Sequence, residues 1–199
     1  MKVSEAIKNR RSVNFFDPDY KITEAEVHEL LEAATLSPSA FNIQHWRFVW
    51  LRDKDVLLQA KQATWFQPQV TEASLVLLVC ADLNAWQVSP ERYWVNAPTS
   101  VSESMINNIE QIYPDNPQLQ RDEGMRSAAM ASMTLMLKAQ EMGLDSCAMA
   151  CDEEKMAELV NLPPDHAICM VLAIGKRLEE PYPRPGLLTL KDVLLINSF

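Results

Sequence analysis

Apolar residues recur at helical or strand spacing along most of the chain, and they predict helices and strands in alternation. Thr23 and Glu26 predict the start of one helix, because a hydroxyl at the N-cap and a carboxylate three residues later form a capping box. Its buried side is then marked by four apolar residues at helical spacing: Val27, Leu30, Leu31 and Ala34.

Three segments predict the main strands of a sheet. Residues 46–51 alternate and are bulky, whereas 74–81 and 167–174 are almost continuous apolar runs, typical of strands covered on both faces. Residues 145–151 predict a short strand or a loop. Further helices are expected at 55–63, 101–112 and 153–160, and a loop after residue 112 is expected to act as a lid. One domain, residues 1–199, of α/β or α+β type follows.

The segment 127–142 is helical in pattern but leaves almost no polar face. Such a helix must be buried on most sides, and its small residues and methionines favour packing against a partner chain as well as its own core. The alternative is a helix buried within its own chain. The apolar tail, residues 187–199, is likewise expected to lie across its own core or a partner.

Composition narrows the classes of partner. The chain has 199 residues and a net charge of -9, which argues against nucleic acid or an anionic membrane, because both require positive surface. No window is long and apolar enough to span a bilayer, and the N-terminus enters an amphipathic pattern directly. These features predict a cytoplasmic protein.

Metal and nucleophilic chemistry receive little support. Three of the four cysteines lie in apolar runs, no close Cys-x-x-Cys pair is present, and the histidines are scattered, so no metal site is predicted. No convincing Ser-His-Asp or Cys-His arrangement is present, and His45 beside Trp46 is interpreted as structural.

Two polar segments are candidates for binding. Arg10 and Arg11 before Ser12 suit an anion, although these residues taken alone favour the simpler interpretation of a solvated helix end. Residues 37–46 combine turn formers, amides and aromatic side chains in a shaped loop, for which an ordinary helix-to-strand turn is the alternative.

Four segments in order strongly resemble the FMN-dependent nitroreductase family. They are Arg10-Arg11-Ser12; Ser37-Pro38-Ser39-Ala40-Phe41-Asn42 with Gln44 and Trp46; Gly143-Leu144-Asp145-Ser146-Cys147; and Ile174-Gly175 followed by Pro181-Tyr182-Pro183-Arg184. The resemblance implies an α+β layered fold with a central mixed sheet flanked by helices. It also implies an intertwined homodimer with two FMN sites at the subunit interface.

The resemblance assigns roles to individual positions. The FMN phosphate would be held by Arg10, Arg11, Ser12 and Arg184. The loop of the other subunit would line the flavin through Pro38, Ser39, Ala40 and Asn42. Gln69 would meet the pyrimidine edge, with Gln67 competing for that role. The backbone near flavin N5 would be that of Met149, Ala150 and Cys151.

Three positions depart from the family pattern. Many relatives carry Arg or Lys where this chain has Asn14, Lys where it has Tyr182, and an acidic residue with Gly where it has Ala150-Cys151. Since positive charge by the pyrimidine stabilises reduced anionic flavin, we expect a lower reduction potential than in relatives with a cation at position 14.

The activity implied is ping-pong transfer of hydride from NADH or NADPH, through flavin N5, to a nitroaromatic or quinone acceptor. A flat acceptor would be walled by Trp65, Phe66, Trp86, Tyr93 and Trp94, for which ordinary packing is the alternative. One alternative function is an FMN-binding storage or sensor protein with little turnover. Another is an α/β module that binds a different anionic ligand.

Overall fold

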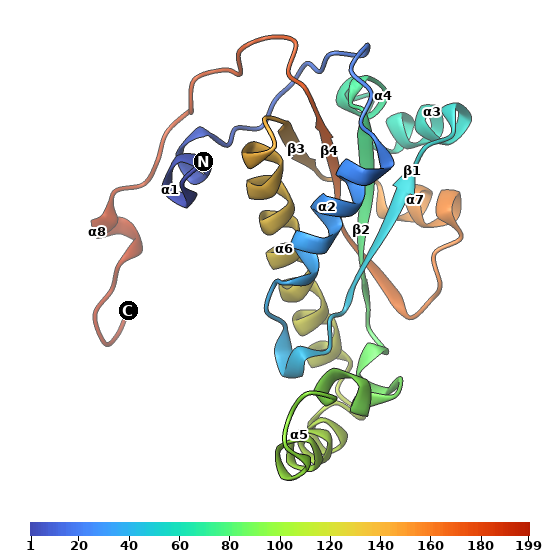
Figure 1. Cartoon of the computed structure of the whole chain (residues 1–199), viewed down its shortest axis with the longest axis vertical. Helices are drawn as coiled ribbons and strands as arrows, with labels where there is room; N and C mark the ends of the chain where they lie inside the picture. Colours follow the sequence, from blue (N-terminus) through green and yellow to red (C-terminus); the bar gives the residue numbers. More distant parts are fainter.

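The computed structural model describes all 199 residues and contains eight α-helices, three short 3₁₀ helices and four strands (Figure 1). In chain order the elements are α1 (Val3–Asn9), α2 (Glu24–Thr35), η1 (Ala40–Asn42), β1 (Trp46–Leu51), α3 (Lys54–Ala63), α4 (Gln69–Glu72), β2 (Leu75–Asp82), η2 (Ala85–Gln87), η3 (Pro90–Trp94), α5 (Thr99–Ile112), α6 (Pro117–Glu141), β3 (Asp145–Met149), α7 (Glu153–Val160), β4 (His166–Gly175) and α8 (Leu190–Val193). The α+β layered fold is confirmed.

The strands form one sheet in the order β1-β2-β4-β3, and all three pairings are antiparallel. The expectation of a mixed sheet was therefore wrong for these strands. The only parallel pairing is an isolated bridge between Ser12 and Ser146 at the β3 edge. Buried, continuous apolar strands suggest parallel pairing, but here the helices that cover both faces bury an antiparallel sheet equally well.

Helices cover both faces of the sheet (Figure 1). Side chains alternate along β2, so Val76 and Leu78 face α3, α4 and α7, while Leu75 and Leu77 face α2 and α6. The capping box of Thr23 and Glu26 is present as predicted.

A small lobe extends beyond one end of the sheet, built from η2, η3 and α5 (Figure 1). It has its own apolar cluster, whose buried members are Ile43, Ala85, Tyr93, Ile109 and Tyr113.

The helix α6 is longer than the pattern indicated. The Asn116 side chain accepts a hydrogen bond from Leu119 N at 3.2 Å, and Pro117 occupies the first helical position, so the helix begins ten residues before Ser127. The prediction of a lid loop after residue 112 was therefore wrong, because only the turn 113–116 separates α5 from α6.

The C-terminal tail leaves the body of the molecule and carries α8 outward (Figure 1). Leu187 is 83% exposed, and the apolar residues after it are exposed as well. The tail therefore does not lie across its own core, which was one of the two expected arrangements. None of the helices combines the length and apolar character needed to cross a bilayer.

Candidate functional site

Three arginines meet where the segment after α1 passes the C-terminal tail. Arg184 Nη2 donates hydrogen bonds to the carbonyl oxygens of Arg10 at 2.7 Å and Lys8 at 3.2 Å, and Arg11 donates to the carbonyl of Tyr182. Burial, and then the charges of Arg184 and Arg11, lower the pKa of Arg10. None of the three forms an ion pair with a carboxylate. Crowded cations of this kind suit a multiply charged anion.

Ser12 is placed beside these arginines by the sheet. Val13 is fully buried in the core, and its backbone N–H donates to Ser146 O at 3.1 Å, so the segment runs along the β3 edge. Since side chains alternate along an extended segment, Ser12 and Asn14 point away from that core, exposed and half-buried respectively.

Gln69 lies near the same edge. Its side chain is buried, with Nε2 at 3.9 Å from Cys147 Sγ, and its Oε1 is a buried acceptor with no partner. Burial raises the pKa of Cys147, whereas the Gln69 contact and the charge of Arg10 act in the opposite direction, so α4, β3 and Arg10 converge here. Gln67 is half-buried and its side chain forms no hydrogen bond in the protein.

The segment after β3 offers backbone donors. The Met149 side chain is buried in the core, Ala150 is exposed and Cys151 is half-buried. Neither Ala150 nor Cys151 donates its backbone N–H to a backbone carbonyl, whereas the next residue, Asp152, is held through its N–H to Ala63 O at 2.8 Å. Two adjacent free N–H groups can donate to an acceptor atom of a ligand.

The loop containing Pro38, Ser39, Ala40 and Asn42 is strained and internally bonded. Phe41, Asn42 and Gln44 have φ of 50°, 56° and 55°, in the left-handed region that non-glycine residues seldom adopt. Ser39 Oγ accepts from Gln44 N at 3.0 Å, and Asn42 Nδ2 donates to Tyr93 O at 2.8 Å. The structure thus holds this loop rigidly in a costly conformation, a signal that residue types alone did not reveal.

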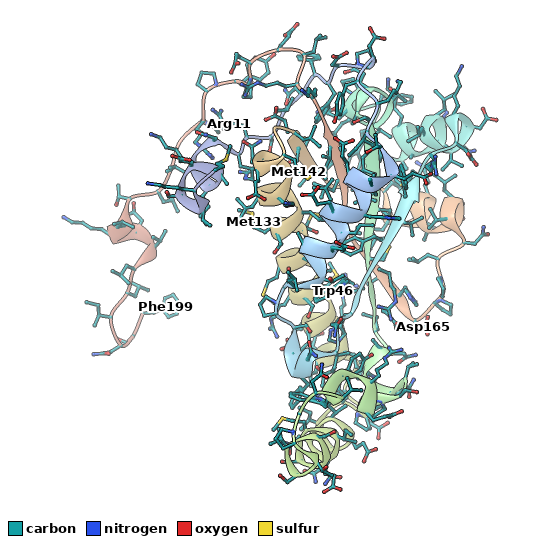
Figure 2. All side chains as sticks on the ribbon, viewed as in Figure 1. Arg11, Trp46, Met133, Met142, Asp165 and Phe199 are labelled. Carbon is teal, nitrogen blue, oxygen red and sulfur yellow. The ribbon has the colours of Figure 1, made fainter.

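Within one chain these residues form two separate groups. Arg11 lines a cavity with Gln140 and Gly143 at the end of α6 that leads to β3, and Gln69 contacts Cys147 on β3, whereas the η1 loop lies near the opposite end of α6, toward α5 (Figure 1). Figure 2 shows the same separation between Arg11 and Trp46. One chain alone therefore does not bring the loop to the arginines.

A cavity of about 660 Å³ lies between α1, the end of α6 and residues 176–180. Among the candidate residues only Arg11 lines it, so this cavity does not by itself define the site.

The aromatic residues proposed for the acceptor pocket fall into a packed group and an exposed group. Trp86, Tyr93 and Trp94 pack in or against the small core of the lobe, as their alternative interpretation holds. Trp65 and Phe66 are 61% and 70% exposed and have left-handed φ, so they remain available for contacts.

The sequence did not reveal a group formed by Asp82, Asp165 and His166, whose ligand atoms lie within 4.8 Å of one another. The β2–β4 register places Asp82 opposite His166, which spacing along the chain cannot show. Asp82 Oδ2 lies 2.6 Å from Arg47 Nη2, which neutralises its charge, and Asp165 Oδ1 lies 2.8 Å from His166 Nδ1, so both carboxylates already have partners.

Comparison with known proteins adds independent findings. The sequence model of the Nitroreductase family matches residues 7–176. Protein DrgA of Synechocystis sp. (strain ATCC 27184 / PCC 6803 / Kazusa) is 49% identical over 181 residues, covering 90% of this chain and 86% of that protein. The oxygen-insensitive NADPH nitroreductase of Helicobacter pylori (strain ATCC 700392 / 26695) is 28% identical over 190 residues, covering 90% of this chain and 89% of that protein.

A solved structure is similar over nearly its whole length. It is that of an Exiguobacterium sibiricum 255-15 protein assigned as a nitroreductase and crystallised in complex with FMN. The TM-score is 0.91 at 28% identity, and the match covers 99% of this chain and 98% of that one.

Proposed function

Because this chain belongs to the nitroreductase family, we propose that it is an FMN-dependent oxidoreductase that passes hydride from NADH or NADPH to nitroaromatic or quinone acceptors. When bound, FMN supplies the redox chemistry through its N5 position, and donor and acceptor use the same site in turn, in a ping-pong order. The protein has to bind, orient and tune that group.

The observation that carries the proposal is the cluster of Arg10, Arg11 and Arg184 without carboxylate partners. It fits a phosphate monoester, whose oxygens accept charge-assisted hydrogen bonds from guanidinium groups. Ser12 adds a hydroxyl donor at the adjoining edge of the sheet.

The remaining residues fit the flavin ring. The unpartnered Oε1 of Gln69 suits an N–H donor on the pyrimidine edge, which favours Gln69 over the half-buried Gln67. The free backbone N–H groups of Ala150 and Cys151 suit an acceptor nitrogen such as N5. No side chain here has to act as a nucleophile.

We propose further that the active unit is a homodimer. The loop 38–42 lies too far along α6 to line the flavin of its own chain, whereas a second copy can bring its loop to the arginines (Figure 1). Met130 and Met133 on α6 are 39% and 36% exposed, and the tail is exposed and apolar, so two surfaces are suited to a partner. Met133 projects from the side of α6 away from the sheet (Figure 2).

A cytoplasmic location is proposed because all four cysteines are free, as suits a reducing compartment.

The proposal is tested by the visible spectrum of the purified protein. We expect flavin bands, bleaching on anaerobic addition of NADH or NADPH, and recovery of colour when a quinone is added. A colourless protein that takes up no added FMN would contradict the proposal and favour the module that binds another anion. Bleaching without steady-state turnover of any quinone or nitroaromatic compound would favour the storage or sensor alternative.

A further inference from the structure

A pocket of about 410 Å³ lies beside the strained loop. It is lined by Gln44, Trp46, Arg47, Arg92 and Tyr93. The hydrogen bond from Asn42 Nδ2 to Tyr93 O, at 2.8 Å, joins the loop to the η3 segment that forms one wall. The pocket therefore adjoins the part of the chain that we expect to reach the flavin of a partner subunit.

The frame of this pocket is fixed by hydrogen bonds. Tyr93 is buried and its hydroxyl donates to Ala85 O at 2.8 Å. Gln44 is held through its backbone N–H to Ser39 Oγ at 3.0 Å, and its side-chain Nε2 lies 3.3 Å from both oxygens of Asn42. A pocket with a rigid frame can position a ligand without first ordering its own walls.

The two arginines of the pocket differ in their charge balance. Arg47 is neutralised by Asp82, with Nη2 and Oδ2 at 2.6 Å. Arg92 forms no ion pair, and the adjacent Glu91 does not pair with it. In a chain with a net charge of -9, this leaves an unneutralised cation at the wall of a pocket.

Arg92 is also held in place. Its guanidinium carbon lies 4.7 Å from the centre of the Tyr93 ring, and its Nη2 lies 2.5 Å from the Tyr93 hydroxyl oxygen. Stacking on an aromatic face leaves the edge of the guanidinium group free for in-plane hydrogen bonds. Such an edge matches the paired oxygens of a carboxylate, sulfonate or phosphate.

We infer that Arg92 binds an anionic group of the small molecule that exchanges electrons at the partner's flavin. The inference rests on the proposed function and adds a specificity to it, namely a preference for anionic substrates. The anionic group belongs either to the acceptor, as a carboxylate or sulfonate, or to the phosphates of the nicotinamide donor.

The test compares wild-type enzyme with Arg92→Gln and Arg92→Lys, all loaded with FMN. The acceptors are 1,2-naphthoquinone and its 4-sulfonate, and the donor is varied separately. If the acceptor carries the anion, we expect kcat/KM for the sulfonate to fall about tenfold in Arg92→Gln, within the range of one charged hydrogen bond, and kcat/KM for the neutral quinone to change less than twofold. Arg92→Lys should restore part of the loss.

A different change in the kinetic constants is expected if the anionic group belongs to the nicotinamide donor. The KM for NADH or NADPH would then rise about tenfold in Arg92→Gln with either quinone. In both cases the loss should shrink as salt is added, because the site is open to solvent.

Arg52→Gln is the matched control, since Arg52 also stacks on an aromatic ring, 4.3 Å from the centre of Trp50, but lies outside this pocket. It should leave all of these constants unchanged. If the Arg92→Gln enzyme is active and has the wild-type kcat/KM for both quinones and the wild-type KM for the donor, the inference is wrong but the proposed function stands. Wild-type protein without flavin turnover would overturn the proposed function, and the inference with it.

Discussion

At the scale of single residues, the arginine cluster joins positions far apart in the sequence. Arg184 reaches the backbone of Lys8 and Arg10, residues at the other end of the chain. Its guanidinium group therefore both fixes the segment after α1 and adds charge to the proposed phosphate site.

Replacing Arg10 or Arg184 by Ala should weaken FMN binding by about 1.5 to 3 kcal/mol, or roughly 10- to 150-fold, the range of a charged hydrogen bond. Fluorescence titration of FMN into apoprotein measures the change. Arg121→Ala is the control, because Arg121 is exposed on α6, away from the cluster. Wild-type affinity in both cluster variants would place the anion site elsewhere.

His45 is a buried polar residue where the small lobe joins the sheet. It is fully buried, neither ring nitrogen has a hydrogen-bond partner, and its ring stacks on Tyr113 with centroids 6.4 Å apart. Burial lowers the pKa of His45 to about 4, because the charged imidazolium would be poorly solvated there.

This lowered pKa predicts acid sensitivity. As the pH falls below about 6.5, unfolded His45 binds a proton and folded His45 does not, so the free energy of unfolding drops by about 3 kcal/mol by pH 4. Urea unfolding at pH 7, 6 and 5 measures the loss. In His45→Phe this part of the pH dependence should vanish, and an unchanged slope would show that His45 does not cause it.

At the scale of elements, the bounds of helices and strands along the chain were easier to predict than the pairing of the strands. The strand 46–51 and the helix 153–160 were predicted at their observed bounds, because alternation and helical spacing are local patterns. The antiparallel order of the sheet and the contact of Asp82 with His166 depend on register between distant strands, which no local pattern encodes.

The site shows the same division. Arg10 and Arg11 were candidates for an anion site from their residue types, the family resemblance added Arg184, and the structure brings the three together. The strain at Phe41 and Gln44 could not be predicted, since neither residue type favours a left-handed backbone and the conformation is imposed by surrounding contacts.

The exposed methionines of α6 give a prediction for this element. Met130→Glu combined with Met133→Glu should break the homodimer, because two charges would be buried in each half of an apolar contact. Light scattering coupled to size exclusion should report a monomer with reduced FMN content. Gln111→Glu, an exposed change on α5, should leave the dimer intact. A double variant that remains dimeric would exclude this face of α6 from the interface.

At the scale of the whole molecule, two features of the single chain bear on the proposed homodimer. Its loop and its arginines lie at opposite ends of α6, and its tail extends into solvent with Phe199 far from the sheet (Figures 1 and 2). Both features fit the proposed homodimer, in which a second copy would receive the tail and contribute its loop.

Deleting residues 187–199 should therefore weaken the dimer, because the apolar side chains of the tail would no longer be buried on a partner. Sedimentation velocity over a range of protein concentrations should show dissociation at higher concentration than for the full chain. The deletion retains Arg184, so its hydrogen bond to the carbonyl oxygen of Arg10 can still form within each chain. An unchanged dissociation constant would mean that the tail does not contribute to association.

Residues 10–12 contact segments that are synthesised much later, near the edge formed by β3. These contacts determine when the arginine cluster can form during synthesis. Ser12 pairs with Ser146, and Arg184 bonds to the backbone of Arg10 across 174 positions. The arginines of the proposed phosphate site can therefore assemble only after residue 184 has left the ribosome. A nascent chain shorter than about 184 residues lacks this contact, so capture of FMN at the proposed site would follow the synthesis of Arg184.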